Sequence, residues 1–158
     1  MNALIACVGK LKESWQKEGC EEYLKRLSRY GKYEIGQVPD EPEPERPSDA
    51  LSLQVMQKEG RALLRLVKPG DFLAALCVDG KALSSTDLAA EMRTWENSGR
   101  RVVFAIGGSL GLSPEVISRA DARISFSRMT FPHGLMRVIL LEQLYRAERI
   151  NAGERYHK

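Results

Sequence analysis

The stretch Phe104–Pro114, FAIGGSLGLSP, places three glycines between an apolar run and a proline. Glycine has no Cβ and adopts positive φ at little cost, so such a segment lets a ligand approach backbone N–H and C=O groups closely. The pattern Gly107-Gly108-x-x-Gly111 is compatible with a phosphate-binding loop, an adenosine-binding wall or a simple strand-to-helix turn. Taken alone, it favours a ligand site and a plain turn about equally.

Two common nucleotide-binding motifs fit the glycine segment poorly. A phosphate-binding P-loop needs a lysine directly after its last glycine, and Leu112 follows Gly111 here. A dinucleotide fingerprint needs Gly-x-Gly-x-x-Gly and an acidic residue about 20 positions later, whereas the next predicted strand ends in Ser125 and Ser127. A nicotinamide-dependent oxidoreductase is therefore disfavoured.

Two further segments of unusual composition follow predicted strands. DGKALSST begins after Val78, and SRMTFPHG begins where another strand is expected to end, at Ser127. In an open α/β sheet, ligands bind outside the carboxyl ends of the strands. We therefore expect these two segments and the glycine segment to form one binding edge.

The elements that must position these segments alternate along the chain. Apolar runs predict strands, and apolar residues at helical spacing predict helices, several of them with serine caps or a closing glycine. The sequence predicts strands at 3–8, 33–38, 72–78, 102–106 and 123–127, and helices at 13–30, 48–67, 84–98, 114–120 and 134–150. This order predicts an α/β fold with a mostly parallel sheet flanked by helices.

Two connections are predicted from their composition. Asp79-Gly80 is expected to turn the chain after the third strand. The segment 39–47, PDEPEPERP, is rich in proline and acids and is expected to be a solvated connection within one domain rather than a domain boundary.

Composition limits the classes of function. The chain has 158 residues, of which 43% are hydrophobic, so it can bury the core of one ordinary domain. A net charge of +3 permits a polyanionic partner without requiring one. An odd set of three cysteines fits a reducing cytoplasm, and no apolar run approaches the ~20 residues that a membrane crossing needs. With two histidines and no clustered thiols, we expect no metal site.

Across its whole length, the chain carries several stretches in a characteristic order. They are VGK near the start, LCVDGKALSS, IGGSLGLS, SFSRMTFPHGLMRVILLEQLYRA and the final GERYHK. Together they resemble the family of ribosomal RNA large-subunit methyltransferase H, of the SPOUT class. No single stretch is specific, but the combination is.

The resemblance implies a single SPOUT domain over residues 1–158 with a C-terminal trefoil knot in roughly 72–158. It also implies that S-adenosylmethionine, the methyl donor, binds between three walls without an acidic fingerprint. The implied cofactor-binding residues are Leu76 in the first wall, Gly107 and Gly108 in the second, and Ser127, Arg128, Met129, Thr130, Phe131 and Pro132 in the third. A bulky residue at Gly108 is expected to fill this slot. Cys77 stands where many relatives have aspartate, and Asp79 is displaced from that position by two residues.

The resemblance further implies the substrate, a pseudouridine in helix 69 of 23S ribosomal RNA, methylated at N3 on the ribosome. The residues it implies for substrate binding or proton handling are Arg146, Tyr156 and His157. Judged alone, a penultimate histidine is more simply a frayed end of the chain. His133, just before a helix, is either a base or, more simply, a structural turn residue.

The class also implies a homodimer, in which the tail of one chain meets the cofactor slot of the other. The basic residues between positions 10 and 32 can line a path for RNA, but the glutamates among them are equally typical of a mixed solvated face. A noncatalytic ribosome-binding factor with the same fold remains the alternative, and cofactor binding without methyl transfer would support it.

Overall fold

The computed structural model describes residues 1–156. Strands and helices alternate from the first element to the last, as the sequence predicts. In chain order they are β1 (Asn2–Val8), α1 (Ser14–Leu27), β2 (Lys32–Val38), α2 (Asp49–Leu64), β3 (Phe72–Ala82), α3 (Ser85–Asn97), β4 (Val102–Ile106), α4 (Pro114–Arg119), β5 (Ala122–Ser125) and α5 (His133–Asn151).

The five strands form one sheet in the order β2-β1-β4-β3-β5, and every neighbouring pair is parallel. Alternate residues of the central strands face opposite sides. In β4, Phe104 packs in the core on one face and Val103 in the core on the other, and all five residues of the strand are buried. A strand covered on both faces must be apolar throughout, which explains its unbroken hydrophobic run.

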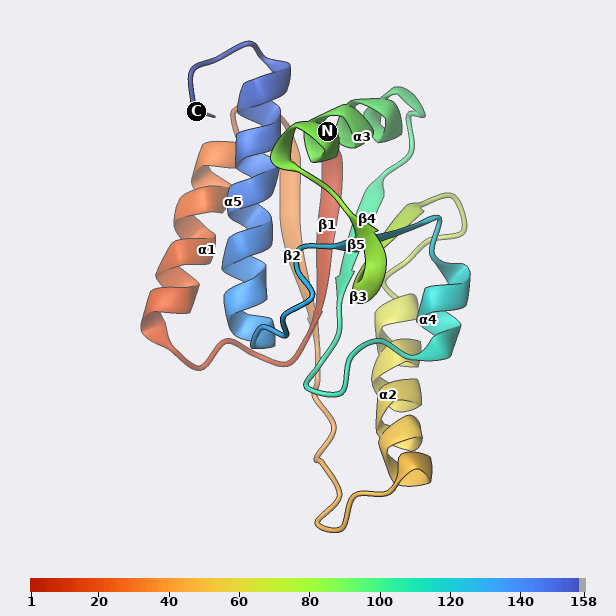
Figure 1. Ribbon diagram of the computed structural model, residues 1–158. Helices are drawn as coiled ribbons and strands as arrows, with labels where there is room; N and C mark the ends of the chain where they lie inside the picture. The colour runs from red at the N-terminus through yellow and green to blue at the C-terminus, as the bar shows by residue number, and fades with distance from the viewer. Residues whose placement is uncertain (157–158) are drawn as a thin grey trace.

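Helices cover both faces of this sheet (Figure 1). The larger core lies between the sheet and α1, α3 and α5, and α5 packs against both α1 and α3. The smaller core lies under α2 and α4, which pack against each other. The predicted α/β fold with a parallel sheet flanked by helices is therefore confirmed.

Serine caps fix the starts of three helices. Ser48, Ser84 and Ser113 each accept a hydrogen bond from a backbone N–H in the first turn of α2, α3 and α4. At α3 the cap is reciprocal, because the Asp87 carboxylate accepts from the backbone N–H of Ser84. Such caps satisfy N–H groups that have no partner within the helix.

The turn predicted at Asp79-Gly80 is wrong, because β3 continues to Ala82. Both Leu76 and Lys81 pair with Ile124 of β5, so the residues between them bulge out of the ladder. An ideal Cβ at Gly80 would lie 2.5 Å from the backbone carbon of Ile124, so only glycine fits this close approach. The glycine allows a bulge here rather than a reversal of the chain.

The fifth strand also ends earlier than predicted, at Ser125 instead of Ser127. The Ser125 hydroxyl donates a hydrogen bond to the Ser127 carbonyl at 3.0 Å, and Ser127 Oγ accepts from the backbone N–H of Met129 at 3.0 Å. These local bonds replace the ladder and turn the chain away from the sheet.

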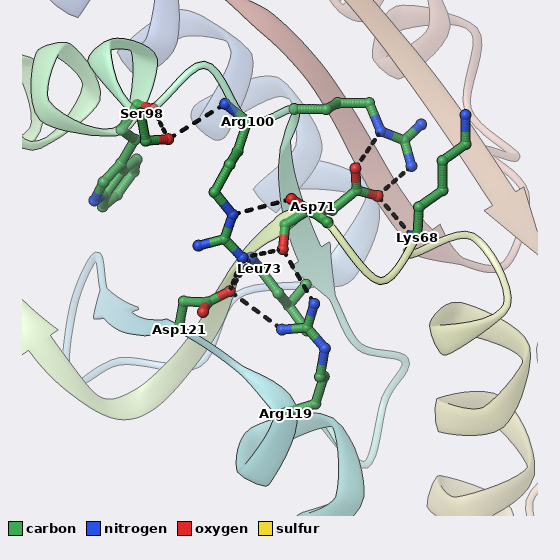
Figure 2. Close-up of polar contacts among 10 residues, drawn as sticks. Lys68, Asp71, Leu73, Ser98, Arg100, Arg119 and Asp121 are labelled. Carbon is green, nitrogen blue, oxygen red and sulfur yellow. Dashed lines mark hydrogen bonds and ion pairs between the residues drawn. The ribbon is translucent and has the colours of Figure 1, made fainter.

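A polar network joins the amino ends of β3, β4 and β5. Arg101 donates from Nε and Nη2 to the buried Asp71 carboxylate at 3.1 and 2.5 Å. Asp121 accepts from the backbone N–H of Leu73 at 2.8 Å and from Arg119 at 3.1 Å. Figure 2 shows Arg100 and Arg119 both directed at Asp121. The network connects the first residues of these strands at the amino edge of the sheet, opposite their carboxyl ends.

Replacing Asp71 by asparagine tests this network. Burial alone would raise the pKa of Asp71, but hydrogen bonds from Arg101 and from the Lys68 N–H outweigh it and hold that pKa below its usual value. The carboxylate therefore stabilises the fold above its unfolded pKa of about 3.9, and this contribution is lost as pH falls through the lower folded value. We expect Asp71→Asn to reduce the free energy of unfolding by about 2 kcal/mol at pH 7.

Urea unfolding of both proteins from pH 7 down to pH 2 measures this effect. The two stabilities should converge at the acid end, because the wild type loses there what the variant already lacks. Asp79→Asn, which removes an exposed carboxylate, is the matched control and should change little. A constant gap across the whole range would contradict the role given to the Asp71 charge.

Candidate functional site

A cavity of about 620 Å³ lies at the carboxyl edge of the sheet. It is lined by residues of β3 and its bulge, of the segment after β4, and of the segment from β5 into α5. This size suits an organic ligand or cofactor. The structure thus brings together the glycine segment and the segment SRMTFPHG. No residue of DGKALSST lines the cavity, so this part of the prediction is wrong, and the wall is completed instead by Leu76, Cys77 and Val78, which come before that segment within β3.

Eight of the nine residues named as cofactor-binding line this cavity. They are Leu76, Gly107, Gly108, Ser127, Met129, Thr130, Phe131 and Pro132. Arg128 is exposed and is not among the lining residues. The geometry therefore groups the eight and leaves Arg128 outside, and the role of each in binding stays a prediction.

The glycine segment folds back on itself at the end of β4. Gly108 and Gly111 form an isolated antiparallel bridge, and the Gly111 N–H donates to the Gly108 carbonyl at 3.1 Å. Gly111 has φ of +87°, which other residues rarely adopt. An ideal Cβ at Gly107 would lie 2.5 Å from the backbone carbon of Gly111. Larger residues would therefore force this tight loop open.

A side chain at Gly108 was expected to fill the cofactor slot, but the structure directs it elsewhere. An ideal Cβ at Gly108 would lie 2.8 Å from Glu59 Oε2 and 3.2 Å from Val8 Cγ1. Neither of those residues lines the cavity. A substitution at Gly108 would therefore push against α2 and β1 from behind the wall instead of entering the cavity.

The cavity wall is mainly apolar side chains and backbone. Among the lining residues of the described chain there is no Asp, Glu, Lys or Arg. Cys77 lines the cavity, and burial raises the pKa of its thiol, so at neutral pH the side chain is an uncharged thiol. Asp79 is exposed and lies outside the lining, so it does not replace an acid at position 77.

His133 is the imidazole in the cavity wall. Burial lowers its pKa, and the positive charge of Arg137 one turn along α5 lowers it further. At neutral pH the ring is therefore uncharged and has one nitrogen able to accept a proton. Its position as the first residue of α5 fits a structural role as well.

Arg137 is fully buried behind this wall and joins α5 to β1. Its Nη2 donates to the carbonyl oxygens of Val8 and Gly9 at 2.8 and 2.6 Å. Val8 is the last residue of β1, and Gly9 follows it. The side chain therefore fixes the start of α5, and with it Pro132 and His133, against the sheet.

Arg146 and Tyr156 lie together, and Arg146 is near the carboxyl end of α5, whereas the cavity residues His133 and Met136 are near its start. Arg146 Nη2 donates to Glu142 Oε1 at 2.5 Å, and the Tyr156 hydroxyl donates to the same oxygen at 3.3 Å. The Arg146 guanidinium lies 4.7 Å from the centre of the Tyr156 ring. Met136, in the cavity wall, and Arg146 are ten residues apart, or about 15 Å along a helix. His157 lies outside the described residues.

Three residues of this region were not predicted from the sequence. Glu59 lies behind Gly108, Arg137 behind His133, and Glu142 between Arg146 and Tyr156. A charged residue within an otherwise apolar helix face is the signal for Arg137. Glu59 gives no such signal, because α2 looks like an ordinary amphipathic helix until its packing is known.

Within residues 1–156, no group of three or more His, Cys, Asp or Glu side chains is arranged to hold a metal ion. No helix in that range is both long and apolar enough to cross a bilayer.

Comparison with known proteins agrees with the geometry. The family described as "Predicted SPOUT methyltransferase" matches residues 1–157. Proteins named ribosomal RNA large subunit methyltransferase H are similar over the full length of both chains. The relative from Bifidobacterium animalis subsp. lactis is 51% identical over 159 residues, and that from Clostridioides difficile is 52% identical.

Solved structures show the same fold. A methylase family protein from Haemophilus influenzae matches 99% of this chain and 70% of its own, with a TM-score of 0.59 and 10% identity. One from Neisseria gonorrhoeae matches 91% of this chain and 81% of its own, with a TM-score of 0.55 and 12% identity. With the full-length matches in sequence, the chain belongs to the SPOUT methyltransferase family, in the group of ribosomal RNA large subunit methyltransferase H.

Proposed function

We propose that this protein transfers a methyl group from S-adenosylmethionine to N3 of a pseudouridine in helix 69 of 23S ribosomal RNA, on the ribosome in the cytoplasm. The observation that carries the proposal is the cavity at the carboxyl edge of the sheet, where the three segments of the family pattern meet. The names of relatives that are about half identical over the whole chain support an RNA of the large ribosomal subunit as the substrate.

The cavity fits S-adenosylmethionine in size and chemistry. Adenine is uncharged and is recognised by backbone amides and apolar surfaces, which the glycine segment and the wall from Met129 to Pro132 provide. The absence of a Cβ at Gly107 leaves the backbone of that wall bare. The bound cofactor supplies a methyl group on a positively charged sulfur, which a nucleophile can attack.

The chain's own residues must then handle the proton on the pseudouridine N3, since an imide N–H is a poor nucleophile until it is deprotonated. Arg146 is always charged and can stabilise the resulting anion. Burial, with hydrogen bonding to Tyr23 and Glu142, raises the pKa of Tyr156 to about 12, so this phenol donates a hydrogen bond and does not accept the proton at neutral pH. His133, uncharged and in the cavity wall, joins His157 as a candidate acceptor.

A second copy of the chain is needed to bring these groups together. Arg146 and Tyr156 lie at the far end of α5 from the cavity of their own chain. In a homodimer, the tail of one chain can meet the cavity of its partner, which places the cation and the phenol beside the methyl donor. We propose this arrangement, with one SPOUT domain per chain over 1–158 and a trefoil knot within roughly 72–158.

Methyl transfer from labelled S-adenosylmethionine tests the activity directly. Intact ribosomes lacking the modification should accept label at N3 of the helix 69 pseudouridine. Separated subunits and naked 23S RNA, assayed alongside, define the accepted state. Cofactor binding with no label on any of the three would support the alternative of a noncatalytic ribosome-binding factor.

Substituting Gly107 by alanine tests the cofactor wall. The added Cβ would lie 2.5 Å from the Gly111 backbone, so the loop must open and the affinity for S-adenosylmethionine should fall at least about tenfold. Gly70→Ala is the control, because a Cβ there meets nothing within 4 Å. Calorimetric titration of both variants gives the affinities. Equal binding by Gly107→Ala and the wild type would place the cofactor elsewhere.

Mixing two inactive variants tests the shared site. Gly107→Ala disrupts the cofactor cavity, and Arg146→Ala removes the guanidinium that the partner chain is proposed to contribute. A mixed dimer therefore contains one site in which an intact cavity meets an intact Arg146. Random exchange should restore about a quarter of wild-type transfer. Size-exclusion chromatography and circular dichroism of each variant control for folding. No recovery from two folded, exchanging variants would mean that each chain works alone.

A further inference from the structure

A buried carboxylate lies directly behind the glycine wall of the cavity. Glu59, on α2, is only 4% exposed, and its Oε2 has no hydrogen-bond partner among the described residues. Its other oxygen accepts from the Glu41 N–H at 3.0 Å. The position that a Cβ of Gly108 would take is 2.8 Å from Oε2, so a single glycine backbone separates this carboxylate from the cavity that Gly108 lines.

Among residues 1–156, no positive charge is among the groups that act on the Glu59 carboxylate. The charged groups that act on it are the acids Asp40, Glu41 and Glu43, all from the segment between β2 and α2. The nearby Lys58 is exposed and pairs with Glu41 at 2.8 Å. A buried carboxylate without a cation is costly, so a positive charge brought near it by a ligand would be favoured.

Packing holds this carboxylate in place. The next residue, Gly60, lies against the cap of α4, where an ideal Cβ would be 2.2 Å from Ser113 Oγ. Ser113 is itself fully buried. The acidic segment is also attached to the glycine wall, because the Ser109 hydroxyl donates a hydrogen bond to Glu43. These contacts fix the position of Glu59 relative to the glycine wall.

We propose that Glu59 acts through the Gly108 backbone as an electrostatic determinant of cofactor specificity, favouring the positively charged methyl donor over its neutral thioether product. This inference rests on the proposed function. S-adenosylmethionine carries a sulfonium, whereas S-adenosylhomocysteine carries an uncharged sulfur in nearly the same molecule. A fixed negative charge beside the site strengthens binding of S-adenosylmethionine. It does not strengthen binding of S-adenosylhomocysteine, so the product is released more easily after transfer.

Calorimetric titration with three ligands tests the proposal. The probes are S-adenosylmethionine, S-adenosylhomocysteine and sinefungin. Sinefungin is a stable analogue in which a carbon bearing an amine replaces the methylated sulfur. Glu59→Gln keeps the shape and removes the charge. Because burial raises the pKa of Glu59, the titrations are made at about pH 8, where the carboxylate form is favoured.

We expect Glu59→Gln to lower the affinity for both cationic ligands on the order of tenfold, because it removes a charge that lies close to the site in a partly screened interior. S-adenosylhomocysteine should change less than about twofold. Glu45→Gln removes an exposed charge from the same acidic segment and should leave all three affinities within about twofold.

The outcomes separate this inference from the proposed function. Equal weakening of all three ligands would show that Glu59 only supports the wall, and no change in any would show that its charge is not felt in the cavity. Either result overturns the inference and leaves the function standing. A wild-type protein that binds none of the three would overturn both.

Discussion

All five strands pair in parallel, and this pairing determines where the cavity forms. It places residues 76–78 of β3 and the segments that follow β4 and β5 at one edge of the sheet, where they line one cavity although they come from distant parts of the sequence. It also requires helices on both faces, because a parallel sheet is buried on both sides. The cavity is a consequence of this topology, and the glycines make its wall thin.

The positions of charge around the cavity follow one principle. The wall itself is uncharged, while Arg137 and Glu59 are buried behind it on α5 and α2. Arg137 Nη2 donates to the carbonyls of Val8 and Gly9 at the end of β1. Within residues 1–156, Arg137 Nε and Nη1 and Glu59 Oε2, which lies beside the Gly108 backbone, have no hydrogen-bond partner. An uncharged lining suits adenine. Fixed charges buried behind that lining can still act on the charged part of a ligand.

Much of this arrangement could be predicted from the sequence, because its local signals agree with the fold. The apolar run of β4 and the serine caps of α3 and α4 gave the correct elements. The turn at Asp79-Gly80 was wrong because the reason for Gly80 is a contact with Ile124, more than 40 positions away. No local pattern contains that contact.

The candidate cofactor-binding residues were predicted from the family resemblance. Family resemblance grouped eight residues that do line one cavity, but it also included Arg128, whose side chain is exposed. Consecutive residues in a loop point in different directions, so a continuous motif overestimates the lining. Glu59 could not be found at all, since its role depends on how α2 packs behind the glycine wall.

A crystal structure of the protein with S-adenosylhomocysteine would test the proposal that this cavity binds the methyl donor. We expect the ligand between Leu76, the glycine segment and the wall from Met129 to Pro132, with the Arg146 and Tyr156 of a second chain facing it. Ligand bound at another surface, with this cavity empty, would contradict it.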